Sequence, residues 1–248
     1  MNTISILWLR QLKRYFRSRS RLVGSLGQPL LFLIALGFGF GPIYERAAGG
    51  SYIQFLAPGI MAMSVLFTAM FSGIEIIWDR QFGFLKETLV APVSRMEIMI
   101  GRTLGGATVA IFQGTVVLLL SLLVGFRIGD LLCLPLFFLF MLLIALLFTA
   151  LGTAIASKME DMHGFQLIMN FLVMPLFFLS GALFPLENLP RALTIVAMLD
   201  PLSYGVDGLR GALGAGYQFG FAQDFLLLGG ATGVLLIIGS YLFSKIEL

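Results

Sequence analysis

The residue types that most often do chemistry are scarce in this sequence. His163 is the only histidine and Cys133 the only cysteine. One imidazole and one thiol, far apart in the chain, do not supply the ligand set of a zinc site. The sequence has no G-x-x-x-x-G-K-[ST] loop for nucleotide phosphates, no G-x-S-x-G turn and no H-E-x-x-H helix. We therefore predict no catalytic residue, no metal and no cofactor bound by this chain.

The remaining candidates are charged side chains in apolar surroundings. Asp207 and Arg210 are three residues apart, so on a helix they share one face and are expected to form an ion pair. The alternative is that they only cap a short helix. Glu75 lies near the end of a long apolar run, and an ionisable residue in a membrane span is a functional candidate. Its alternative role is structural, as a partner of Arg80 or Arg102.

The elements that must position these residues are membrane-crossing helices. The chain is 58% hydrophobic and 12% charged, whereas soluble domains have about 25% charged residues. A helix needs about 20 apolar residues to cross the hydrocarbon. Six windows of 20 to 28 residues contain no Asp, Glu, Lys or Arg: 22–44, 47–74, 103–126, 131–157, 164–186 and 225–244.

We predict an all-α membrane protein with a single transmembrane domain over residues 1–248. Gly101-x-x-x-Gly105 offers a small face for close helix packing. The phenylalanines at 137, 138, 140 and 148 are expected to face lipid. The predicted parts are an interfacial helix at 1–21, spans at 22–44, 52–78, 98–124, 131–156, 164–184 and 224–244, a connecting segment at 79–97, and short helices at 185–223.

The basic residues predict the orientation. With six spans, 12 of the 16 Lys and Arg residues lie on the side of the two termini, and Arg46, Arg127, Arg191 and Arg210 lie on the other. The positive-inside rule then places both termini in the cytoplasm. A cleaved signal peptide is the alternative for the start of the chain, but its apolar core would be shorter than the window at 22–44.

The first residues predict an amphipathic helix. Arg10, Lys13, Arg14 and Arg17 fall on one arc of a helix, and apolar residues that include Trp8 fall on the opposite arc. Such a helix lies in the membrane surface, with its cations toward anionic headgroups. It either anchors the orientation only, or braces the bundle and touches a partner.

Two connecting segments are unusual. In 79–102, the longest cytoplasmic connection, apolar residues alternate with charges until Pro92 ends the helical stretch. This mixture predicts a docking element. In 185–223, the apolar piece at 192–199 is too short to cross the membrane. It predicts two short helices that dip into the outer leaflet, where irregular backbone must be buried or line a water-filled cavity.

These two segments carry a family resemblance. The sequence FLSGALFP at 178–185, followed by DPLSY at 200–204 and DGLR at 207–210, resembles the ABC-2 type transporter permeases. In that family this block builds extracellular re-entrant helices. The sequence KETLVAPVSR at 86–95 resembles the family's coupling helix, which fits a groove on a separate ATP-binding subunit.

The resemblance implies the roles of particular residues. The ATPase-coupling residues would be Leu85, Lys86, Glu87, Leu89, Pro92 and Arg95. The outer gate would consist of Pro185, Asp200, Pro201, Tyr204, Asp207 and Arg210. Implied partners are two copies of an ABC ATP-binding subunit, which binds ATP and Mg, a second permease copy (identical or paralogous) and membrane lipids, with no nucleic acid.

The resemblance also implies a function. Segment 79–102 lacks the E-A-A…G pattern of importers, which favours export of an amphipathic or lipid-linked substrate (a drug, a lipid or a saccharide carrier) across a prokaryotic cytoplasmic membrane. Spans interrupted by Pro29, Pro58 and Pro175 would alternate between two states, around a pathway with apolar walls rich in Phe and Met. The alternatives are a self-contained channel or carrier, which needs more polar spans, and an assembly scaffold.

Overall fold

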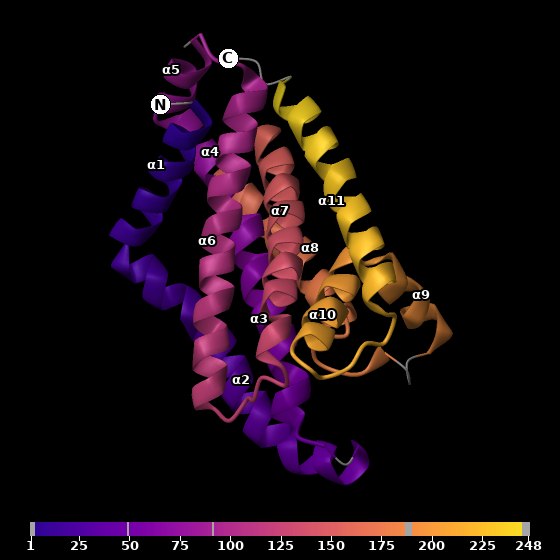
Figure 1. Ribbon diagram of the computed structural model, residues 1–248. Helices are drawn as coiled ribbons and strands as arrows, with labels where there is room; N and C mark the ends of the chain where they lie inside the picture. Colours follow the sequence, from indigo (N-terminus) through magenta and orange to yellow (C-terminus); the bar gives the residue numbers. More distant parts are fainter. Residues whose placement is uncertain (1–2, 49, 91, 187–189, 245–248) are drawn as a thin grey trace.

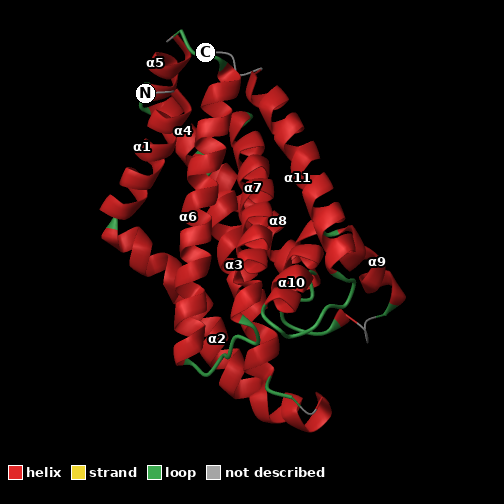
Figure 2. Ribbon diagram, viewed as in Figure 1, coloured by secondary structure: helices red, strands yellow, loops and turns green. Residues whose placement is uncertain are grey.

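The computed structural model describes residues 3–48, 50–90, 92–186 and 190–244. Within these ranges the chain forms helices joined by turns and contains no strand (Figure 2). The helices are α1 Thr3–Arg17, α2 Arg19–Ala48, α3 Tyr52–Phe71, α4 Ile74–Gln81, α5 Phe84–Val90, α6 Arg95–Leu123, η1 Leu131–Cys133, α7 Leu134–Ser157, α8 Met162–Leu179, α9 Arg191–Leu199, α10 Pro201–Ala212 and α11 Phe221–Ser244.

Six described stretches are long and apolar enough to cross a membrane, which confirms the predicted number of spans. Each contains at least 18 residues, close to the length that the hydrocarbon core requires. They are Leu22–Ala47, Tyr52–Gln81, Arg95–Leu123, Leu131–Ser157, Met162–Leu179 and Phe221–Phe243.

The bundle is organised around α3, the most buried of the spans. Helices α2, α6, α7 and α10 pack against α3, α11 packs on α7, and α1 packs along α6. The first turns of α1, all of α5 and the last turns of α11 lie at one end of the bundle, which we call the α5 end (Figure 1). Helices α9 and α10 lie toward the opposite end, which we call the α10 end.

The second span is broken, although the sequence predicts one continuous helix over 52–78. Helix α3 ends at Phe71 and α4 begins at Ile74. The break lies where the backbone of Gly73 passes the backbone of Gly152 in α7 so closely that a Cβ on either glycine would overlap a main-chain carbonyl. Only glycine allows this approach, and α4 stays packed against α7 and α8 beyond the break.

The small face of α6 is used as predicted, and its partner is α1. A Cβ added at Gly101 would lie 3.0 Å from the carbonyl oxygen of Ile4, and one added at Gly105 would lie 2.8 Å from Cβ of Gln11. The two glycines thus let the N-terminal helix pack directly on α6.

The expectation that the phenylalanines of α7 face lipid is wrong for three of the four. Phe137, Phe140 and Phe148 are fully buried, and only Phe138 is partly exposed, at 39%. The reason is the central place of α7, which contacts α3, α6, α10 and α11. Most of the surface that faces outward belongs to α2, α8 and α11, whose spans are the least buried.

Candidate functional site

Asp79 is the centre of an ion network at the α5 end. Its carboxylate accepts two hydrogen bonds from the guanidinium of Arg10, at 2.8 and 2.9 Å, and one from Arg102 at 2.6 Å. Arg14 lies 3.5 Å from the same carboxylate and 3.9 Å from that of Glu75. We call these five residues the Asp79 network.

Burial explains why this network forms. Asp79 and Arg102 are almost completely buried, and an isolated buried charge costs several kcal/mol unless it is paired. Arg10 and Arg14 are four residues apart, so α1 presents both on one face toward α4. The hydrogen bond to Asp79 raises the pKa of the Arg10 guanidinium, so this residue stays charged.

The network corrects the prediction for the N-terminal helix. Arg10 and Arg14 turn toward carboxylates of α4 and not toward lipid headgroups, while Lys13 and Arg17 are exposed. Carboxylates buried in the bundle bind these arginines more strongly than hydrated headgroups would. Since Trp8 also donates from Nε1 to Oγ1 of Thr108 in α6, at 3.0 Å, α1 braces the bundle.

The expected partners of Glu75 were also wrong. Its carboxylate lies beside Arg14, whereas Arg102 binds Asp79. Arg80 donates at 2.9 Å to the carbonyl oxygens of residues 157 and 159, and so fastens α4 to the turn between α7 and α8.

The network reaches the predicted coupling segment through Phe84. The Arg10 guanidinium lies 3.8 Å from the centre of the Phe84 ring, at the start of α5. Within the segment, Glu87, Pro92 and Arg95 are exposed. The side chains of Leu85, Lys86 and Leu89 lie outside the described part of the structure. Phe82 and Val90, which flank them, are about four-fifths exposed, at 80% and 77%.

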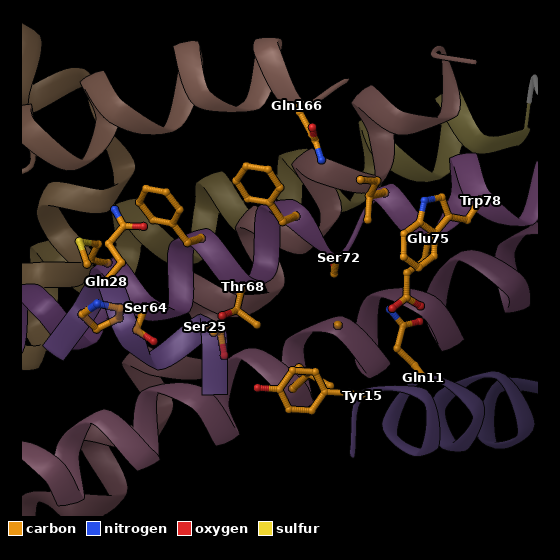
Figure 3. Close-up of a pocket in the computed structure, with 18 residues that line it drawn as sticks. Gln11, Tyr15, Ser25, Gln28, Ser64, Thr68, Ser72, Glu75, Trp78 and Gln166 are labelled. Atoms are coloured by element: carbon orange, nitrogen blue, oxygen red, sulfur yellow. The ribbon is translucent and has the colours of Figure 1, made fainter. Parts of the chain in front are cut away.

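A cavity of about 400 Å³ lies beside the network, among α1, α2, α3, α4, α6 and α8 (Figure 3). Glu75 and Trp78 of α4, and Gln11 and Tyr15 of α1, form its wall next to the network. The remaining lining residues are Gly24, Ser25, Gln28, Pro29, Met63, Ser64, Phe67, Thr68, Phe71, Ser72, Ile74, Gly106, Val109 and Gln166.

At the α10 end, Arg210 holds three segments together. Its guanidinium donates to the carbonyl oxygens of Gly181 at 2.7 Å, Ala182 at 3.3 Å and Phe55 at 3.3 Å, and lies 3.8 Å from the centre of the Phe55 ring. Burial lowers the pKa of Arg210 to about 10, so it remains charged at neutral pH. Arg210 thus joins α10 to α3 and to the turn after α8.

The expected ion pair between Asp207 and Arg210 is wrong, because each side chain binds main-chain groups elsewhere. Asp207 accepts hydrogen bonds from the backbone N–H groups of Gln218 and Phe219, at 2.8 to 2.9 Å. These amides and the carbonyls of Gly181 and Ala182 belong to turns outside regular helices, and a charged side chain satisfies them well.

The other predicted gate residues connect α9 with α10. Asp200 caps α10 by accepting from the N–H of Leu202 at 2.9 Å, and Pro201 occupies the first helical turn. Burial raises the pKa of Asp200 to about 7. Tyr204 donates from its hydroxyl to the carbonyl oxygen of Met198 at 2.7 Å.

Pro185 lies apart from these residues. It lines an apolar hollow of about 360 Å³ between α2, Tyr52 and the turn at 183–185. The residues of the predicted outer gate therefore lie in two places. Pro185 lies at this hollow, and the others lie in α10 or directly before it. The position of α9 and α10 within a membrane leaflet stays a prediction.

Six helices long and apolar enough to cross a membrane, with a cavity between helices of the bundle, define a polytopic membrane protein. Residues 2–213 match the family described as ABC-2 type transporter. The chain belongs to this family and is a membrane subunit of an ABC transporter.

Curated relatives agree with this assignment. The chain is 29% identical over 259 residues to the transport permease ycf38 of Porphyra purpurea, covering 98% of this chain and 88% of the relative. It is 30% identical to ycf38 of Cyanophora paradoxa, with 76% and 66% coverage, so it spans about two thirds of that relative. It is 29% identical to nodulation protein J of Rhizobium leguminosarum bv. viciae, with 76% and 73% coverage.

Proposed function

We propose that this chain is the permease of an ATP-driven exporter that moves an amphipathic substrate outward across a prokaryotic cytoplasmic membrane. Separate ATP-binding subunits would hydrolyse ATP, with Mg, and drive the change between inward-facing and outward-facing states. The α5 end would face the cytoplasm, in accordance with the distribution of basic residues.

The observation that carries this proposal is the connection between α5 and the cavity. Arg10 contacts Phe84 of α5 and Asp79 of α4, while Glu75 and Trp78 of α4 line the cavity. A displacement of α5 by an ATPase would therefore act directly on a wall of the binding space. Alternating access needs an element with two states that nucleotide can bias, and we propose that α4 and α5 form that element.

The proposed assembly contains two ATP-binding subunits and two permeases. Docking of an ATPase on α5 is supported by the exposed side chains of Phe82, Glu87 and Val90. Association of two permeases is supported by the exposed apolar faces of α2 and α8, which carry Phe38 and Phe171 among other large side chains. Large exposed apolar surfaces on a membrane protein meet either lipid or another subunit.

The proposal is tested by co-expressing the chain with its cognate ATP-binding subunit. Glu87→Lys should reduce both copurification of the ATPase and ATP-dependent export several-fold, because it reverses an exposed charge on α5. Glu45→Lys, an equally exposed reversal at the α10 end of α2, is the matched control. Substrate flux that needs no ATP, or equal copurification of the ATPase with both variants, would contradict the exporter mechanism.

A further inference from the structure

The cavity wall differs from the apolar wall that the sequence predicts. Neutral groups that donate and accept hydrogen bonds line it from four of its six helices, α1, α2, α3 and α8 (Figure 3). They are the amides of Gln11, Gln28 and Gln166 and the hydroxyls of Ser25, Ser64 and Thr68. Amides and hydroxyls suit a ligand whose own polar groups are uncharged and both donate and accept.

The described lining residues favour a neutral ligand head over a strongly charged one. Among the described lining residues, Glu75 is the only one with a charge, and its carboxylate lies 3.9 Å from Arg14. Recognition of a phosphate uses arginine or lysine donors, and none of the described lining residues is basic. A cationic head would have to compete with Arg14 for Glu75.

One hydroxyl in the wall points to a missing hydrogen-bond partner. The Ser64 side chain is only 2% exposed, yet its Oγ has no hydrogen-bond partner among the described residues. Buried polar groups are nearly always satisfied, so a ligand group is a suitable partner for this one. The rings of Phe67, Phe71 and Trp78 line the same cavity and can pack against the apolar faces of a bound head.

An apolar path for a chain continues along α2. Toward the α10 end, Leu36, Phe40 and Tyr44 of this helix line the apolar hollow. Gln28 and Phe40 are twelve residues apart, which corresponds to about 18 Å along a helix. Between them, Phe32 and Leu36 follow Gln28 at intervals of four residues on the same face of α2, and both are apolar and partly buried. The polar cavity and the apolar hollow are thus arranged along α2 like the polar head and the apolar chain of a lipid.

We propose that the cavity binds the uncharged head of an amphiphile, bearing several hydroxyl or amide groups, while its apolar chain lies along α2. This inference rests on the proposed function, since it names the class of substrate for the same cavity. It separates neutral heads from the phosphate-bearing and cationic heads of other amphiphiles.

Trp78 provides a reporter for the test. The chain has two tryptophans, so Trp8→Phe leaves Trp78 in the cavity wall as the only one. The full chain in nanodiscs is titrated with three amphiphiles that share a dodecyl chain: dodecyl maltoside, dodecyl phosphate and dodecyltrimethylammonium. We expect dodecyl maltoside to change the Trp78 emission at a concentration at least tenfold lower than either charged amphiphile.

Substitutions locate the binding. Gln28→Leu and Ser64→Ala should each weaken the response to dodecyl maltoside several-fold, with a melting temperature near that of the parent. Gln218→Leu, the same change on an exposed side chain outside the cavity, is the control and should leave the response unchanged.

Two results would overturn the inference: equal affinity for the three heads, or an unchanged response in both cavity variants. Neither depends on the ATPase, because binding is measured on the permease alone. Failure of ATP-dependent export with selective maltoside binding would contradict the exporter proposal and leave the neutral-head site standing. Export with unselective binding would contradict only this inference.

Discussion

Replacing Asp79 should destabilise the bundle more than any other single loss of charge at the α5 end. Asp79→Asn keeps the shape of the side chain but removes the charge that compensates Arg102, which is only 5% exposed. Removing one partner of a buried ion pair typically costs about 3–5 kcal/mol, because the other charge stays buried and unpaired. The contacts of Arg10, whose side chain is one-third exposed, add at most about 1 kcal/mol.

The assay is thermal unfolding of the purified permease. For a chain of this size, a loss of about 4 kcal/mol corresponds to a decrease of roughly 10 °C in Tm. Asp130→Asn is the matched control, because Asp130 is exposed, caps η1 through the N–H of Leu132 and belongs to no ion pair that the described residues record. It should change Tm by less than about 2 °C, because asparagine caps as well as aspartate.

A second substitution tests the cause. In the double variant Asp79→Asn with Arg102→Met, no unpaired charge is buried at this position, and at least half of the lost stability should return. If Asp79→Asn unfolds at the same temperature as Asp130→Asn, the network does not stabilise the fold. If the double variant is less stable than Asp79→Asn, the loss does not come from the unpaired guanidinium.

Two further predictions concern the α10 end. Arg210→Ala should lower the free energy of unfolding by about 2–4 kcal/mol, because it leaves buried carbonyls at Gly181 and Ala182 without donors. A normal Tm together with impaired export would instead support a role of Arg210 in the predicted outer gate. Burial raises the pKa of Asp200 from 3.8 to about 7. Between pH 4 and 7, Asp200 is therefore protonated in the folded chain and ionised in the unfolded chain. Stability should therefore fall by at most about 4 kcal/mol as pH rises from 4 to 7 and change little above that. Melting curves from pH 5 to 8 test this, and Asp200→Asn should remove the dependence; an unchanged slope in that variant would assign it to another group.

The spans could be predicted from sequence because the bilayer imposes a local rule. A window without charges and of the required length must cross as a helix, whatever its neighbours are. The break between α3 and α4 could not be predicted in this way. It depends on Gly73 meeting Gly152 of another helix, a contact between residues far apart in the chain. The burial of Phe137 likewise follows from the place of α7 in the bundle and not from its composition.

The site was predictable only in part, for the same reason. The sequence pointed to charged residues at both ends, but their partners came from other helices. Arg10 meets Asp79 across 69 residues, and Arg210 meets Phe55 across 155. Helical spacing suggested that Asp207 pairs with Arg210. Instead, Arg210 donates to a carbonyl of the turn after α8, and Asp207 accepts from an amide of the turn after α10. The polar cavity wall gave no sequence signal, since its glutamines come from three different helices.

The two ends of the bundle hold their charges in different ways, and this difference bears on which end moves. At the α10 end, Asp207 and Arg210 bind main-chain groups of fixed turns, and a displacement would leave those groups unsatisfied in a buried place. At the α5 end, Arg14 lies within 4 Å of both Glu75 and Asp79, so it can transfer between the two carboxylates while each keeps a cation nearby. A shift of α4 relative to α1 can therefore leave Arg14 paired with one of the two carboxylates, even where the hydrogen bonds of Arg10 to Asp79 are broken. When α5 moves, we expect α4 to move with it and Arg14 to change its carboxylate partner. Glu75 and Trp78, which belong to α4, would then change the shape of the cavity wall.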